Sequence, residues 1–290
     1  MRIGPSPRLT QARFSALLSA VLIAGVPATA LAGPADRYYE RSFVVAAHQR
    51  CNLFQPQLAA ALNAAAWQAR GAALRAGADD RQMAETAARA RARAATTPCA
   101  SSDLKLVKGR VETAFAGWSR TARMVFPGQR ADWTADRAAY ARPTWRLVQT
   151  GRTGASPVSI GVVGGLNRPD QLAAVVSWQG RSRPTGVRLV LRDKTVAPRP
   201  WLARELPPVA QRRVFWAAGV TDAEESLLPE GREAAQTWTF PAAAADALSG
   251  LDPREVFTVE FVFRDGSATR SVFEVGDFAA GRAFLAMGRV

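Results

Sequence analysis

The chain has 290 residues, of which 48% are hydrophobic and 21% are charged, a composition that excludes an intrinsically disordered protein and can fill buried cores. It has 38 basic and 24 acidic residues, which give a formal net charge of +14. This excess has two interpretations: a surface for phosphate or carboxylate groups, or a general abundance of arginine. We favour the second, because alanine and arginine are frequent together in every segment and net charge alone does not define a site.

The first 32 residues have the three parts of a secretory signal. Arg2, Arg8 and Arg13 form a basic start without acidic residues, and an apolar run over 14–26 follows. That run has about 13 residues, fewer than the roughly 20 that a membrane-spanning helix needs. Small residues then precede a predicted cleavage after Ala32. We therefore expect an exported protein, periplasmic or secreted, with no transmembrane segment in the mature chain; the alternative is an uncleaved anchor.

Export narrows the partners that the mature chain can meet. Loss of the three arginines before the cleavage position lowers the +14 total to +11. Nucleic acid is not an expected partner outside the cytosol. The expected partners are another envelope protein, or an anionic envelope polymer or lipid such as lipopolysaccharide or a cell-wall fragment.

Residues 33–126 have a helical pattern, with apolar residues at three- and four-residue steps. Pro56, Gly77 and the Thr97–Pro98 pair interrupt the pattern, and Asp79 is a suitable N-cap. We predict an antiparallel helical bundle with short connections. Its four helices are expected at about 35–54, 57–76, 79–95 and 102–125.

Cys51 and Cys99 are the two cysteines of the chain. In an oxidising compartment an even pair is most simply a disulfide, and its closed loop would stabilise the fold by about 4 kcal/mol in the chain-entropy model. A metal site is the alternative, but two sulfurs and His48 are too few for the four ligands of structural zinc. We predict the disulfide, no metal and no cofactor, and interpret His48 as an ordinary surface or partly buried residue.

Residues 127–143 lose the helical periodicity and are predicted to link two domains. Residues 144–290 then contain short apolar runs separated by turn residues, which predict an antiparallel β-sandwich or barrel-like domain. The clearest signal is a hairpin of 257–263 and 269–275 around Asp265–Gly266. A short helix is expected near 242–248, and a terminal helix after Asp277. The predicted class is thus α+β with two domains.

The sequence offers no assembled catalytic set. It has no Gly-x-Ser-x-Gly elbow, and its one histidine lies in the helical half. Glu224 and Glu225 could act as an acid–base pair on a glycan. However, Thr221 to Glu224 also fits a helix capping box, which explains the residue types without chemistry. We favour the capping box.

Aromatic residues beside arginines are the remaining binding signal in the β half. Most of its tryptophans are expected in the core. Trp201 and Arg199 lie in a proline-stiffened loop, and Arg213 precedes an aromatic pair, so these three are the candidate ligand-binding residues. We expect a non-enzymatic envelope protein that acts as a binding or assembly module. The alternatives are a carrier of an anionic ligand, which predicts an arginine-lined groove on the β half, and a glycan hydrolase using Glu224 or Glu225.

Overall fold

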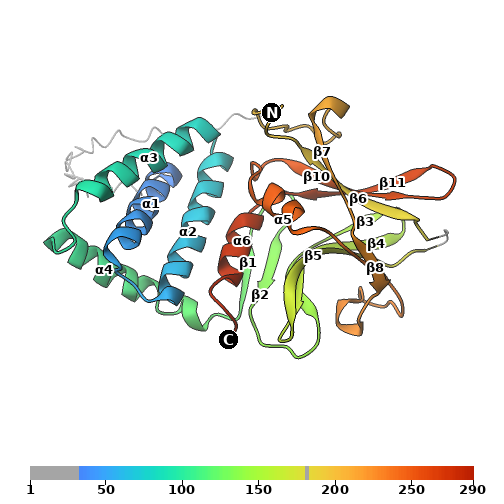
Figure 1. Cartoon of the computed structure of the whole chain (residues 1–290), viewed down its shortest axis with the longest axis horizontal. Coiled ribbons are helices and arrows are strands. Elements are labelled where there is room, and N and C mark those ends of the chain that lie inside the picture. The colour runs from blue at the N-terminus through green and yellow to red at the C-terminus, as the bar shows by residue number, and fades with distance from the viewer. Residues whose placement is uncertain (1–32, 180–182) are drawn as a thin grey trace, which may run out of the picture. The chain divides into compact units, whose positions relative to one another are not determined.

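The computed structural model describes residues 33–179 and 183–290, so the predicted signal peptide lies outside the described residues. Four helices precede the first strand (Figure 1). They are α1 (Pro34–Cys51), α2 (Pro56–Arg75), α3 (Asp80–Thr96) and α4 (Ser102–Phe115), and the 3-10 helix η1 (Trp118–Arg120) follows them. No helix in these ranges has both the length and the apolar character needed to span a bilayer.

Local signals set the ends of these helices. The Asp79 side chain accepts the backbone N–H of Gln82 at 2.7 Å, which is the expected N-cap of α3. Asn52 ends α1 in the left-handed conformation, and His48 Nδ1 accepts the backbone N–H of Phe54 at 3.1 Å. His48 therefore closes a helix end, as an ordinary structural residue does.

The fourth helix is shorter than the sequence indicates. It ends at Phe115 instead of continuing to about residue 125, because the chain joins the sheet as strand β1 (Arg123–Phe126). Phe126 is fully buried and its ring lies 5.9 Å from that of Phe284. Val125 is 54% exposed, so its place in the helical pattern was coincidental.

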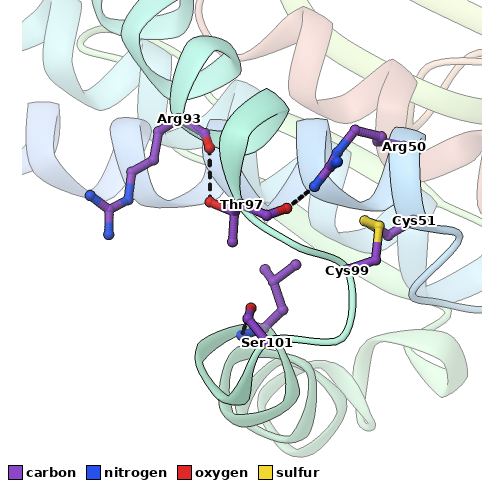
Figure 2. Close-up of a disulfide and its surroundings, with 7 residues drawn as sticks. Arg50, Cys51, Arg93, Thr97, Cys99 and Ser101 are labelled. Carbon is purple, nitrogen blue, oxygen red and sulfur yellow. Dashed lines mark hydrogen bonds between the residues drawn. A yellow bond between two sulfur atoms is a disulfide. The ribbon is translucent and has the colours of Figure 1, made fainter.

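The predicted disulfide joins Cys51 and Cys99, with their Cα atoms 5.6 Å apart. Figure 2 shows that it connects the end of α1 to the segment between α3 and α4. Arg50 donates to the carbonyl of Thr97 beside it. The adjacent core is small, formed by Ala47, Ala94 and Leu104. Such a core supplies little apolar area, which makes the covalent link more important.

Eleven strands form two antiparallel sheets in the described ranges, and the predicted α+β class is confirmed. The larger sheet has the order β1-β2-β3-β4-β5-β9-β8, and the smaller has the order β11-β10-β6-β7. The larger sheet contains β2 (Trp133–Asp136), β3 (Thr144–Thr153), β4 (Ser156–Gly165), β5 (Arg168–Val176), β8 (Gly219–Asp222) and β9 (Gln236–Thr239) beside β1. The smaller contains β6 (Gly186–Arg192), β7 (Arg212–Trp216), β10 (Val256–Val262) and β11 (Ala268–Glu274).

Alternate residues of both sheets contribute to one buried apolar cluster. Ala174 and Val176 of β5 belong to it, as do Val259 and Phe261 of β10. The predicted hairpin of β10 and β11 is present, with Phe257 opposite Phe273. The remaining elements are the helices α5 (Ala242–Ser249) and α6 (Phe278–Leu285) and the 3-10 helices η2 (Val209–Gln211) and η3 (Glu225–Leu227).

Helix α6 is tied to α2 by a buried ion pair. Arg75 donates two hydrogen bonds to Asp277, at 2.8 and 3.0 Å. The side chain of Asp277 is 1% exposed, and burial raises its pKa while Arg75 lowers it. Gly71 makes room for this carboxylate, because a Cβ there would lie 2.2 Å from Asp277 Oδ1. The pair thus fixes the start of α6 against α2.

We expect reduction of the disulfide to lower the free energy of unfolding by about 4 kcal/mol, because the 48-residue separation gives the unfolded chain that much more conformational freedom. Urea unfolding with and without dithiothreitol measures the loss. A Cys51→Ala/Cys99→Ala variant is the control, since its stability should not respond to the reductant. Equal stability of reduced and oxidised wild type would contradict the expectation.

We expect Arg75→Leu to lower the free energy of unfolding by about 3–5 kcal/mol, because it leaves the Asp277 carboxylate buried without its counter-charge. The double variant Arg75→Leu/Asp277→Asn should lose less, since no buried charge is left. Arg81→Leu on α3 is the surface control, because its pair with Glu85 spans 3.8 Å and its side chain is 83% exposed. Urea denaturation of the four proteins measures these differences, and equal losses for the single and double variants would contradict the account.

Candidate functional site

The first residues of strand β5 lack a neighbour on one side. Strand β9 pairs with β5 from Ala173 onwards, and the N–H of Phe240 donates to the carbonyl of Leu172 at 2.9 Å. Of the four residues before this point, Arg168–Gln171, the first and last pair with β4, the register shifts between them, and none pairs with β9. We call Arg168–Gln171 the β5 notch. Pro169 suits this place, because proline has no N–H to donate to a neighbouring strand.

An apolar hollow lies at the notch, between β5 and the helices α5 and α6. Its volume is about 500 Å³. Its walls are mostly aliphatic or aromatic, with Arg282 at one side, where it donates to Asp246 and Ser249. The lining residues are Val162, Pro169, Asp170, Gln171, Leu172, Ala218, Phe240, Pro241, Ala242, Ala245, Arg282, Leu285 and Ala286. The hollow can accept a flexible apolar chain.

A shallow arginine groove adjoins the apolar hollow. It has a volume of about 780 Å³ and is lined by Arg146, Leu166, Asn167, Arg168, Pro169, Asp170, Leu285, Gly288 and Arg289. The two concavities share three lining residues, Pro169, Asp170 and Leu285. A single ligand can therefore contact both.

A β-bulge places Arg146 at the groove. Trp145 pairs with Val163 and Leu147 pairs with Val162, so Arg146 has no partner in the ladder. Bulges of this kind change the direction of a side chain. The side chain of Arg146 is 2% exposed, and burial lowers its pKa. Its Nη1 donates to the carbonyl of Ala138 at 3.0 Å, whereas its Nε has no hydrogen-bond partner among the described residues.

The groove has more positive than negative charge. Asp170 is the one carboxylate among the described residues that line it, and its Oδ1 lies 3.8 Å from Arg146 and 3.7 Å from Arg289. Arg168 lies 3.9 Å from Glu224, outside the groove. These separations are longer than hydrogen bonds, so the pairs leave N–H donors of the guanidinium groups open. The groove can bind a phosphate or a carboxylate, the groups that arginine contacts with two parallel hydrogen bonds.

The residues predicted to bind ligand lie elsewhere. Trp201 is half-buried; its backbone N–H donates to Glu255 at 3.2 Å and its indole N–H donates to the carbonyl of Glu205 at 2.7 Å. Arg213 places its guanidinium 5.0 Å from the centre of the Phe215 ring. Arg199 is exposed in the loop before Trp201. None of the three predicted residues lines the hollow or the groove.

The loop of Trp201 is held by a buried ion pair. Arg192 and Glu255 are both 1% exposed and form two hydrogen bonds of 2.6 Å. Arg192 also donates to the carbonyl of Ala197. Glu255 therefore fixes the loop at two places, one through Arg192 and one through the N–H of Trp201. These contacts show that the residues of the Trp201 loop hold its conformation.

The predicted capping box at Thr221–Glu224 is wrong. Thr221 lies in β8 and pairs with Thr237 of β9, so the sheet uses its backbone groups. Glu224 precedes η3 and makes no side-chain cap. Glu225 is 87% exposed, and Arg142 lies 3.7 Å from its carboxylate. Glu224 and Glu225 thus lie at the surface, without the apolar enclosure that tunes a glycosidase acid.

Comparisons with protein-family models, with curated proteins and with solved structures found no match. In residues 33–179 and 183–290, no cluster of three or more His, Cys, Asp or Glu side chains could hold a metal ion. The site is therefore described from its own geometry.

The sequence does not single out Arg146, Arg168 and Arg289 as candidate site residues. Their common feature, arginine beside apolar residues, recurs throughout the chain and marks no position. A weak signal existed at Arg146, a charged residue inside an otherwise apolar strand run. The role of this charged residue depends on the bulge, and the bulge is a property of the pairing between β3 and β4.

Proposed function

We propose that the protein is an exported, non-enzymatic carrier of an anionic amphiphile. The apolar hollow would take the aliphatic chain and the arginine groove would take the phosphate or carboxylate. One observation carries the proposal: a groove lined by Arg146, Arg168 and Arg289 shares its wall with an apolar hollow of about 500 Å³.

Two energetic arguments support this ligand class. Hydrogen bonds from guanidinium groups to an anion are about twice as strong as those between neutral groups. Burial of apolar surface contributes about 25 cal/mol per Å², so a chain of several methylenes adds binding energy that a free anion lacks. Together they favour an amphiphile over either part alone.

The wider architecture fits the same proposal. Helices α1 to α4 of residues 33–126 would form a bundle that docks an envelope partner. Residues 144–290 would form a β-sandwich domain that carries the ligand, with β1 and β2 joined to its larger sheet. The proposed signal peptide over 1–32 would deliver the protein to the periplasm or the exterior, where anionic lipids and cell-wall fragments are the available ligands.

Variants of the arginine groove test whether it binds the anionic group of the ligand. The probe is n-dodecyl phosphate, and calorimetry measures its affinity. Arg289→Gln should weaken binding about tenfold, because it removes a charge that faces the ligand. Asp170→Asn should strengthen binding severalfold, because it removes the carboxylate that competes with the ligand. Raising the salt concentration should weaken binding, because salt screens exposed charges.

Arg199→Gln is the matched control, since Arg199 is exposed in another loop. It should leave the affinity for n-dodecyl phosphate unchanged. If Arg199→Gln weakens binding while Arg289→Gln and Asp170→Asn do not, the ligand binds at the Trp201 loop and the groove proposal is wrong.

Filling the apolar hollow tests the aliphatic part. Ala218 lines it from an exposed position, so Ala218→Phe adds a ring to the wall without entering the core. We expect this variant to bind n-dodecyl phosphate at least tenfold more weakly and to keep its melting temperature. Equal affinities for n-dodecyl phosphate and n-butyl phosphate in the wild type would contradict a role for the hollow.

A further inference from the structure

A third concavity lies at the β5 notch, and we call it the threonine hollow. The proposed function assigns it neither the aliphatic chain nor the anionic group of the ligand. Its volume is about 400 Å³. Arg168 and Pro169 line both it and the arginine groove, and Pro169 and Gln171 line both it and the apolar hollow. The threonine hollow is lined by Pro143, Val163, Gly164, Arg168, Pro169, Gln171, Ala173, Thr221, Asp222, Glu224, Leu227, Thr237 and Thr239.

Hydroxyl groups of neighbouring strands gather in this hollow. Thr221 of β8 lies opposite Thr237 of β9, and Thr239 follows two residues later on the same face. Thr237 is 7% exposed, and its hydroxyl has no hydrogen-bond partner in the described part of the chain. Buried hydroxyls are nearly always hydrogen-bonded. Because Thr237 lines the hollow, a rotation of its side chain would let a ligand there pair with this hydroxyl.

Open acceptors surround these hydroxyls. Asp222 lies 3.9 Å from Arg183, and Glu224 lies 3.9 Å from Arg168, so neither ion pair is a hydrogen bond. Gln171 adds an amide that both donates and accepts. The hollow therefore offers carboxylates, which accept hydrogen bonds, together with hydroxyl and amide groups, which both donate and accept them.

This set matches a polyol better than an ion. The two carboxylates would repel an anion. An ammonium group would meet Arg168 and, having donors only, would leave the amide and guanidinium donors unpaired. Sugar and cyclitol hydroxyls donate to carboxylates and also accept from amides and guanidinium groups. Small apolar residues such as Ala173 leave room for the C–H face of a ring.

We propose that the carried amphiphile bears a polyol, such as a sugar or cyclitol ring, next to its anionic group, and that this ring binds in the threonine hollow. The inference rests on the proposed function, because the anionic group at Arg168 and Arg146 joins the ring to the chain in the apolar hollow. The ligand class is thus an anionic glycolipid.

Two lysolipids with the same acyl chain test this inference by calorimetry. Lysophosphatidylinositol has the polyol ring, and lysophosphatidic acid has the chain and the phosphate alone. We expect the wild type to bind the inositol lipid about tenfold more tightly. Thr237→Val keeps the shape of the side chain and removes its hydroxyl, so it should abolish this preference without weakening the binding of lysophosphatidic acid.

Thr153→Val is the matched control. Thr153 is 6% exposed, as buried as Thr237, but its hydroxyl is paired with that of Thr269 at 2.6 Å. We expect Thr153→Val to lower the melting temperature and to keep the lipid preference. Thr237→Val should keep the melting temperature of the ligand-free protein, because its hydroxyl has no partner to lose.

The outcomes separate the two proposals. If both lysolipids bind equally, or if Thr237→Val keeps the preference, the polyol inference is wrong and the carrier function stands. If neither lysolipid binds, the carrier function and the polyol inference fall together. A preference that Thr237→Val removes and Thr153→Val retains supports both.

Discussion

The candidate site depends on a difference in length between two neighbouring strands. Strand β5 begins at Arg168, but β9 pairs with it only from Ala173, and Phe240 just after β9 bonds to Leu172. Four residues of β5, Arg168–Gln171, therefore extend past their neighbour. A strand of equal length would fill the space where the three concavities meet. Backbone groups at such an edge can also pair with another chain. Here Pro169 removes one of the donors that such pairing would use.

Buried arginines have two different roles in this protein, and their hydrogen-bond partners distinguish these roles. Arg192 is buried and has a carboxylate partner in Glu255, and Arg137 is buried and donates to several carbonyls, among them that of Gly288. Both therefore hold chain segments together, as a buried charge requires. Arg146 is equally buried, yet one of its donors has no partner in the described residues. A high arginine content alone does not reveal this difference, because all three residues look alike in the sequence.

The sequence predicts features that depend on residue type and spacing better than features that depend on pairing between strands. The N-cap Asp79 and the Cys51–Cys99 link are predictable from residue type and spacing, and the structure has both. The bulge at Arg146 and the pairing of Thr221 depend on the register between strands, which a local pattern does not contain. Thr221 to Glu224 fits a capping box locally, but the sheet pairing with β9 determines its conformation. The notch likewise arises from two strand ends that lie far apart in the sequence.

Helix α6 connects the helical part of the chain to the candidate site. Its start is fixed to α2 by the pair of Arg75 and Asp277, and Leu285 at its end lines both the apolar hollow and the arginine groove. Gly281 brings the helix close to β3, since a Cβ there would lie 2.6 Å from the Leu147 side chain. A shift of α2 would therefore move the wall of the candidate site through α6. This arrangement connects the disulfide-linked helices to the candidate site by direct contacts.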